Sequence, residues 1–492
     1  MTTHKNVLLI LTDQQRKDSM GCYGNPYAHT PHLDRLAAQS VKFERCYVAN
    51  PICMPNRMSI FTGRYPRSHG MWTNGLLLDR QPATAADWFA QAGYQTASIG
   101  KLHFAPYSAK ADSGSLESAD RWRSFSDDFD WNGPYCGFDH VELTIGHTNP
   151  IAHYGRWFRE NGGTPEMLSR TPLSGIADTG ARGLPEKLHD STFIADRTIQ
   201  YLKTQRQEDK PFFLVASFPD PHHPFDPPEE TAARYRDKPV KEPVGSKQDL
   251  QTRPDHYQMH YEGRWHRKGE IEPDYPDEMT DTQIKERIRN TYAMVELIDQ
   301  NIGRMLDSLE ESGLAEDTVI VFTSDHGELL GDHGLWYKGP FFYEGLMNVP
   351  LLVSAKGTLG ARVTNHLASS VDIFPTLCEL AGISPPDDID GLSLNRHLIE
   401  PDEVVRDRCI IEYRPGFGQT DTDSKAIVTD RWKLVQYGHG ACELTDLKLD
   451  PEERQNRSCL PENQAVIESL RHQLLCEVIL TENKKPEQLS HA

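Results

Sequence analysis

The chain has 492 residues, of which 37% are hydrophobic and 25% are charged, and its 52 Lys and Arg against 72 Asp and Glu give a net charge of −20. A chain of this length can bury a sizeable core, and the composition excludes a disordered or fibrous protein. The chain is acidic and contains no long run of Lys or Arg, so we expect neither nucleic acid nor a membrane as its main partner.

The N-terminus and the cysteines predict the compartment. The apolar run 7–11 is too short for the hydrophobic part of a signal peptide, and no stretch is long enough to span a membrane, so we expect a cytoplasmic protein. The 9 cysteines are odd in number and include no Cys-x-x-Cys pair. We therefore expect reduced thiols, most of them buried, rather than disulfides.

Short apolar runs rich in β-branched residues alternate with helical patterns along the first 385 residues. This alternation predicts an α/β fold, with a large, mainly parallel sheet sandwiched by helices. In chain order we expect a strand at 6–12, a helix at 30–39, a strand at 41–48, a helix at 83–92, strands at 94–99 and 211–218 separated by a helix at 190–204 capped by Asp190, a helix at 282–312, and strands at 318–323 and 349–353.

The pattern changes near residue 386. Strands are predicted at 408–413, 426–429 and 432–436, followed by a helix at 462–480, which suits a smaller α+β subdomain with an antiparallel sheet. We therefore predict a large α/β domain at 1–385 and a C-terminal subdomain at 386–492.

Two long segments, 104–187 and 225–281, are rich in aromatic residues and lack clear periodicity. They serve either as surface covering or as walls of a pocket, and segments of this length inside a compact domain are often functional. We hypothesise that the second one is a lid or a contact between subunits of a homo-oligomer.

Two predicted strands end in potential metal ligands. Asp13 and Gln14 follow the first strand, and Asp325 and His326 follow the strand at 318–323. Ligands of open α/β sheets bind outside the carboxyl ends of the strands, so these residues can converge on one site. Either Asp alone is better explained as a cap of the next turn, but the two pairs together favour a metal site.

A third segment places Cys53 at the start of a short helix. Pro55 suits the first helical turn, and unpaired amides at a helix N-terminus favour an anion and lower the pKa of a thiol. Arg57 follows one turn later, on the same face of this helix as Cys53. Considered alone, such a cysteine is an ordinary buried thiol.

Several ordered segments resemble those of the sulfatase family, whose fold is alkaline-phosphatase-like. Cys53-Met54-Pro55-Asn56-Arg57 matches its C-x-P-x-R motif, and Thr62-Gly63-Arg64 matches the usual continuation of that motif. The other similar segments are Gly100-Lys101-Leu102-His103, Asp220-Pro221-His222-His223-Pro224-Phe225, Asp325-His326-Gly327 and Lys338-Gly339.

The resemblance implies a small sulfate ester as the substrate and a modified cysteine as the nucleophile. In the family, a formylglycine-generating enzyme oxidises the cysteine to formylglycine, and the hydrated aldehyde attacks the sulfate ester. The resemblance also implies one divalent metal ion, with ligands Asp13, Gln14, Cys53 as formylglycine, Asp325 and His326.

The remaining matched residues correspond to the family's catalytic groups. Arg57 and Lys101 would hold the hydrated aldehyde in its reactive form. Lys338 and His222 resemble the pair that binds the sulfate and protonates the departing alcohol. His103 would accept the proton of the second hydroxyl, so that sulfate is expelled and the aldehyde is restored.

Two departures from the common family pattern leave the substrate open. Many members have consecutive Asp residues in place of Asp13-Gln14, and Asn in place of His326. An amide and an imidazole shift metal preference from Ca²⁺ towards Mn²⁺, with Mg²⁺ as a further candidate. This ligand set looks like that of phosphonate monoester and phosphodiester hydrolases. We therefore predict a sulfatase, with a phosphonate hydrolase as the alternative and a catalytically silent anion-binding protein with unmodified Cys53 as a third hypothesis.

Overall fold

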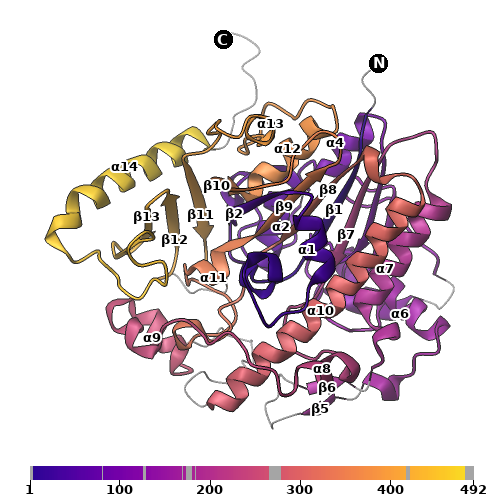
Figure 1. The fold of residues 1–492 in the computed structure, drawn as a ribbon, viewed down its shortest axis with the longest axis horizontal. Coiled ribbons are helices and arrows are strands. Elements are labelled where there is room, and N and C mark those ends of the chain that lie inside the picture. The colour runs from indigo at the N-terminus through magenta and orange to yellow at the C-terminus, as the bar shows by residue number, and fades with distance from the viewer. Residues whose placement is uncertain are drawn as a thin grey trace.

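A mixed sheet of eight strands forms the centre of the computed structural model, in the order β10-β2-β9-β8-β1-β7-β3-β4 (Figure 1). The structure describes residues 4–79, 81–125, 129–168, 170–172, 180–182, 184–264, 279–416 and 421–482. The strands of this sheet are β1 Asn6–Thr12, β2 Val41–Tyr47, β3 Gln95–Gly100, β4 His140–Leu143, β7 Phe212–Phe218, β8 Thr318–Ser324, β9 Asn348–Ala355 and β10 Arg362–Ser369.

The sheet is mainly parallel, as predicted. β1 pairs in parallel with β7 on one side and β8 on the other, whereas β9 runs antiparallel to both β8 and β2. β7 and β8 are buried along their whole length, which is typical of strands covered on both faces. Because β1 and β8 are adjacent and parallel, their carboxyl ends lie side by side.

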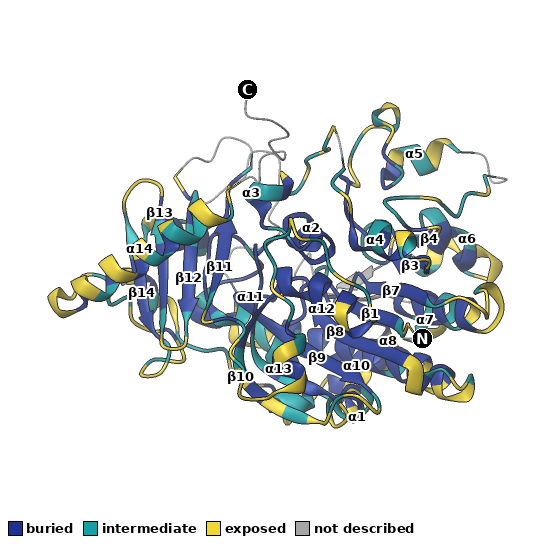
Figure 2. Cartoon of the chain, turned by 90° about the horizontal axis from the view of Figure 1, so that it is seen from above, coloured by how far each residue is buried: buried dark blue, intermediate teal, exposed yellow. Residues whose placement is uncertain are grey.

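Helices cover both faces of the sheet, and alternate side chains of β1 reach each layer. Leu8 and Ile10 pack with α1 (Pro31–Ala37), α7 (Asp190–Gln200) and α10 (Asp281–Glu311). Val7, Leu9 and Leu11 lie in the other core cluster, with α2 (Cys53–Thr62), α4 (Ala85–Gln91) and α12 (Ile373–Leu380). This alternation follows from the two-residue period of a strand. Figure 2 shows the buried strands in the centre of the molecule.

Two predicted helices, α10 and α7, differ slightly at their ends from the prediction. The Thr280 hydroxyl accepts a hydrogen bond from the Gln283 amide and caps α10, close to the predicted start at 282. His189, rather than Asp190, occupies the N-cap position of α7, and its Nδ1 lies 3.3 Å from the Ser191 amide nitrogen. α7 ends at Gln200, and a π-helical turn, Tyr201–Gln205, occupies the rest of the predicted helix.

A second, antiparallel sheet of four strands lies towards the C-terminus, in the order β11-β12-β13-β14. Its strands are β11 Arg408–Tyr413, β12 Ser424–Thr429, β13 Trp432–Tyr437 and β14 Cys442–Asp446, and α14 (Gln464–Leu480) packs on them through Ile467, Leu470 and Leu474. In Figure 1 this sheet and α14 lie to one side of the large sheet. The division between residues 385 and 386 stays a prediction.

The long segments without periodicity contain short elements. The segment 104–187 holds α5 Ala119–Ser124, β4, α6 Ala152–Glu160 and the paired strands β5 Arg170–Pro172 and β6 Gly180–Arg182. The segment 225–281 holds α8 Glu229–Tyr235 and α9 Asp255–Tyr261, and its residues 265–278 lie outside the described part of the chain. The other short helices are α3 Pro66–His69, α11 Glu344–Met347 and α13 Asn395–Ile399.

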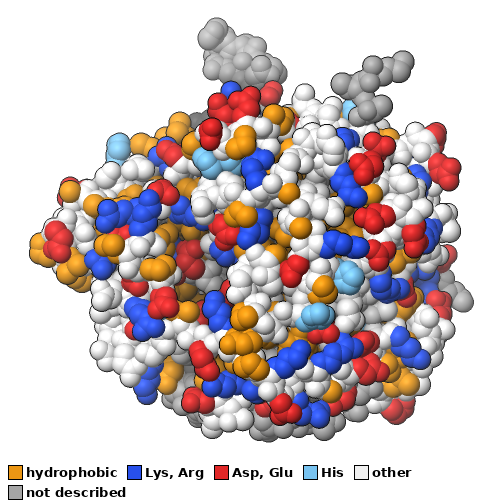
Figure 3. Space-filling view, viewed as in Figure 1, with side chains coloured by type: hydrophobic (Ala, Val, Ile, Leu, Met, Phe, Trp, Pro, Cys, Tyr) orange, Lys and Arg blue, Asp and Glu red, His pale blue; other side chains and the backbone are white. Residues whose placement is uncertain are grey.

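All nine cysteines are free thiols, as expected. The expectation that most of them are buried is wrong, since only Cys46, Cys53, Cys378 and Cys409 are buried. Within the described residues, no helix is both long and apolar enough to cross a membrane. Figure 3 shows basic and acidic side chains interspersed over one face of the molecule.

Candidate active site

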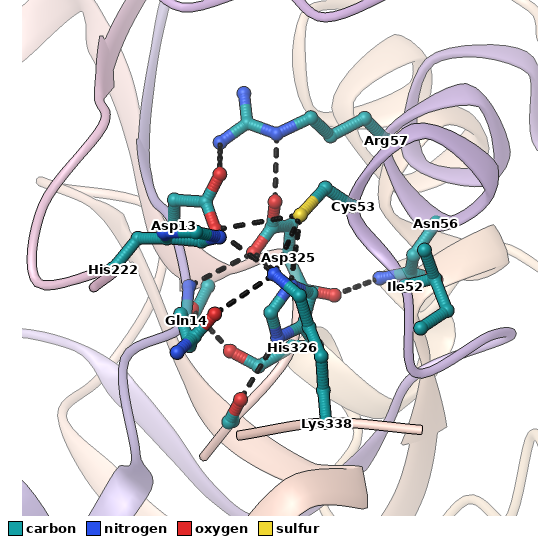
Figure 4. A network of polar contacts seen from close by, with 12 residues as sticks. Asp13, Gln14, Ile52, Cys53, Asn56, Arg57, His222, Asp325, His326 and Lys338 are labelled. Carbon is teal, nitrogen blue, oxygen red and sulfur yellow. Dashed lines mark hydrogen bonds and ion pairs between the residues drawn. The ribbon is translucent and has the colours of Figure 1, made fainter. Parts of the chain in front are cut away.

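The residues predicted at two strand ends and one helix start meet in space. Asp13 follows β1, Asp325 and His326 follow β8, and Cys53 is the first residue of α2. One potential ligand atom from each of these four buried residues lies within 4.8 Å of the others. Figure 4 shows the Cys53 sulfur at the centre of this cluster, so the structure brings together side chains that are up to 313 positions apart (13 to 326).

Local backbone geometry places Cys53 at the start of α2. Ile52 is extended, and the helix ends at Gly63, which adopts φ 64° and donates its amide to the Ser59 carbonyl at 2.9 Å. A residue with a side chain rarely adopts this left-handed conformation, which accounts for the glycine after Thr62. The helix is therefore short, fully buried and fixed at both ends.

The Cys53 sulfur lies between acidic and basic groups. It is 3.1 Å from His326 Nε2, 3.0 Å from Lys338 Nζ and 3.7 Å from Asp13 Oδ1. Burial and the Asp13 carboxylate raise the pKa of the thiol, but Lys338 and His326 lower it, and the net shift of the pKa is downward. An anionic group is therefore favoured at this position.

Arg57 links the carboxylates that follow the two strands. Its side chain is fully buried, and its Nε donates to Asp325 Oδ2 at 2.7 Å while one terminal nitrogen lies 3.5 Å from Asp13 Oδ2. The other terminal nitrogen donates to the Lys101 carbonyl at 2.7 Å and to Ser217 Oγ at 2.9 Å. The planar guanidinium thus fixes the orientation of both carboxylates.

Lys101 reaches the cluster from the end of β3. A Cβ at Gly100 would lie 1.9 Å from the Ser217 carbonyl oxygen, so only glycine permits this close approach of β3 to β7. Lys101 Nζ lies 2.5 Å from Asp13 Oδ2. Burial raises the pKa of Asp13, but the cations Lys101 and Arg57 outweigh burial and hold this pKa well below its usual range.

Gln14 turns its carboxamide oxygen towards Lys338, at 2.8 Å from Nζ, because its amide nitrogen donates to Glu328. Glu328 is 1% exposed and also accepts from the amides of Leu330 and Tyr337. Glu328 was not predicted from the sequence. Its only signal was its place three residues after Asp325.

The donor set fits a divalent metal ion. His326 Nδ1 lies 2.8 Å from the Gly327 carbonyl, which favours the proton on Nδ1 and leaves Nε2 free to coordinate. This Nε2 is 3.6 Å from Asp13 Oδ1 and 3.6 Å from Asp325 Oδ1. Ligands about 2.0–2.2 Å from a shared ion lie at such separations from each other.

Histidines form the remaining wall of the site. The ring of His222 stacks on that of His147, with centroids 3.9 Å apart and an angle of 9°, and it also contacts the ring of His223. Burial, His147 and His223 hold the pKa of His222 well below its usual range. His147 was not predicted from the sequence, because it lies outside every motif.

His103 lies at the edge of the site, where its backbone has φ 61° and its amide donates to Glu117. Its pKa is held well below the usual range, first by burial and then by Lys101 and Arg57. All ten residues predicted for the site therefore lie in or beside one cluster.

The sulfatase family profile matches residues 5–383 of this chain. The chain belongs to the sulfatase family. The C-terminal profile of N-sulphoglucosamine sulphohydrolase matches residues 331–479. The fold, including the second sheet, is therefore that of a sulfatase.

Relatives of this sulfatase are named for two chemistries. An arylsulfatase of Clostridium perfringens is 30% identical over 96% of this chain and 94% of its own. An N-acetylglucosamine-6-O-sulfatase of Bacteroides thetaiotaomicron is 26% identical over 92% of this chain and 83% of its own. The structure of a phosphonate monoester hydrolase of Agrobacterium radiobacter superposes with a TM-score of 0.79 at 25% identity, covering 97% of this chain and 96% of that one.

Proposed function

We propose that this sulfatase hydrolyses a sulfate monoester with a nucleophile derived from Cys53. The position of Cys53 carries the proposal, because its sulfur lies against Lys338 and within ligand distance of the Asp13, Asp325 and His326 cluster. A sulfuryl group spreads negative charge over its oxygens during transfer, and fixed cations stabilise that charge. Arg57, Lys101 and Lys338 supply such cations.

The Cys53 thiol stands in for the hydrated aldehyde of formylglycine, which we propose a formylglycine-generating enzyme produces at this position. Asp13, Gln14, Asp325 and His326 would hold a divalent ion, which when bound acts as a Lewis acid towards the hydrate and a sulfate oxygen. The mixed oxygen and nitrogen set suits Mn²⁺, with Ca²⁺ and Mg²⁺ as the other candidates.

The side chains around the nucleophile have separate proposed tasks. Arg57 and Lys101 orient the nucleophile through Asp13 and Asp325. Lys338 and His222 bind the sulfuryl group and protonate the departing alcohol; the negative charge of the bound sulfuryl group would raise the low pKa of His222 for this step. His103 accepts the proton whose loss restores the aldehyde. Each proposed task uses a group that lies in or beside the cluster around Cys53.

Kinetic comparison of an aryl sulfate with an aryl phosphonate tests this proposal. We expect the metal-loaded, converted protein to show the larger kcat/KM on the sulfate, because this ratio reports transition-state stabilisation. A far larger kcat/KM on the phosphonate would support the second candidate, a phosphonate monoester or phosphodiester hydrolase. That candidate is favoured by the Gln14 and His326 ligands and by the similar phosphonate hydrolase structure.

We further propose a sulfated sugar as the substrate class, as in the relatives named for N-acetylglucosamine 6-sulfate and iduronate 2-sulfate. A cavity of about 570 Å³ lies between the α3 region and the second sheet, a size suited to a small ligand. Its lining combines aromatic rings, among them Trp72, with polar groups, among them Asn50, Arg67, Glu412, Lys425 and Gln436.

One residue that lines this cavity is close to the nucleophile in the chain. Asn50 accepts a hydrogen bond from the Ile52 amide at 2.9 Å, and three residues of extended chain span at most about 11 Å, so Asn50 lies near Cys53. We expect Trp72→Ala to raise KM for a sulfated disaccharide and to leave an aryl sulfate unaffected. Equal effects on both substrates would contradict a sugar in this cavity.

A further inference from the structure

A buried ion network lies behind the candidate active site, at the N-terminus of α7. His189 Nδ1 is 3.0 Å from Asp190 Oδ1, and His189 Nε2 is 3.6 Å from Asp220 Oδ2. The three side chains are at most 1% exposed. Burying charged groups is costly, and loss of one member would leave the charges of the other two uncompensated. The network therefore holds together the segments that carry it.

These segments carry two imidazoles of the site. Asp190 Oδ2 accepts a hydrogen bond from the Thr148 amide at 2.8 Å, directly after His147. Asp220 stands two residues before His222, and its carbonyl accepts from the Asp13 amide at 3.3 Å. The network therefore ties the loop after β4 to the turn after β7.

The backbone at Thr148 needs this support. Its φ is 46°, a left-handed conformation that is unfavourable for a β-branched residue. Such strained conformations persist where surrounding contacts hold the backbone in place, and the hydrogen bond from the Thr148 amide to Asp190 is one of these contacts. By fixing the backbone here, Asp190 fixes the direction of the neighbouring His147 side chain.

His147 in turn reaches the cations of the site. Its Nε2 lies 3.3 Å from Lys101 Nζ, which pairs with Asp13, and its ring stacks on His222 at 3.9 Å. None of the motifs predicted from the sequence contains His147, Asp190 or His189.

We propose that the His189–Asp190–Asp220 network positions the stacked His147 and His222 rings beside the substrate's anionic group. His147 is then an additional anion-binding residue, and Asp190 is a positioning residue that acts through it. This inference rests on the proposed function, because it assigns the ring pair to the sulfuryl group.

Calorimetric binding of inorganic sulfate to the metal-loaded protein tests the inference without turnover. We expect Asp190→Ala and His147→Ala each to weaken binding about tenfold, which is the size of one lost hydrogen bond to a charged group. The double variant should bind no more weakly than His147→Ala, because the two residues act as one unit. Asp190→Asn keeps an oxygen for the Thr148 amide and should recover part of the affinity.

Asp299→Ala is the matched control. Asp299 is also fully buried and accepts from a backbone amide, that of Leu33 at 2.7 Å, but it belongs to α10 and α1 rather than to the site. The Asp299→Ala variant should lose stability and keep its affinity for sulfate.

Two results would overturn the inference: unchanged sulfate affinity in Asp190→Ala, or losses that multiply in the double variant. If Asp190→Ala does not fold, Asp220→Asn tests the network from its other end, beside His222, and unchanged sulfate affinity in this variant would overturn the inference. Failure of the wild-type protein to hydrolyse any sulfate ester would contradict the proposed function, whereas the sulfate-binding measurements would still decide the role of the network.

Discussion

Replacing Glu328 by Gln should turn the carboxamide of Gln14 away from the metal position. One Glu328 oxygen accepts from the amides of Leu330 and Tyr337, and the other accepts from Gln14 Nε2. A glutamine at position 328 would keep its single oxygen on the two backbone donors and point its NH₂ group at Gln14. The Gln14 amide would then rotate to offer its oxygen, leaving its own NH₂ group facing Lys338.

The expected cost is a weaker metal site. Loss of a group that orients a metal ligand typically lowers metal affinity by about 10-fold to 100-fold, or about 1.4–2.7 kcal/mol. Calorimetric titration of chelator-treated Glu328→Gln with Mn²⁺ measures this loss directly. Glu296→Gln is a suitable control. Glu296 lies on α10, outside the site, where it is buried and pairs with Arg234 of α8 at 2.7 Å. If Glu328→Gln bound Mn²⁺ as tightly as the wild type, the orienting role of Glu328 would be refuted.

Three further predictions concern the residues around the nucleophile. Arg57→Lys should lower the free energy of unfolding in urea by about 3–5 kcal/mol, because an ammonium cannot replace a buried guanidinium that serves Asp325, Asp13 and Ser217; a loss near zero would contradict this. Cys53→Ala should abolish hydrolysis while leaving the fold intact by circular dichroism, and measurable turnover would exclude Cys53 as the nucleophile precursor. Asp190 and Asp220 raise the pKa of His189 to about 9 against the opposing effect of burial. Because this pKa is raised on folding, its contribution to stability should be complete below about pH 6.5 and lost as the pH rises through about 9. His189→Gln should remove this pH dependence from unfolding measurements, and an unchanged pH profile would refute the assignment.

The fold could be predicted where single strands carry their own signal. β1, β7 and β8 are continuous apolar runs because both of their faces are buried, and all three were predicted to within one residue at each end. β10 was missed because the first five of its eight residues are mainly polar and mostly not buried, at the edge of the sheet, and β4 because it has only four residues. Both strands are defined by their neighbours more than by their own composition.

The site divides in the same way. Cys53 and Arg57 lie in a compact motif whose spacing follows one helix, so the sequence was sufficient to find them. Glu328 and His147 act through tertiary contacts with Gln14 and Lys101, which depend on how distant loops fold back together. No local pattern marks such residues, and only the structure reveals them.

The state of residue 53 in protein from its native host tests the central claim most directly. Mass spectrometry of the peptide that contains Cys53 distinguishes formylglycine from an unmodified thiol. We predict that formylglycine predominates and that its proportion follows sulfate ester hydrolysis across preparations. If only the free thiol were found in protein from the native host, the proposed nucleophile would be contradicted and the anion-binding alternative would be favoured.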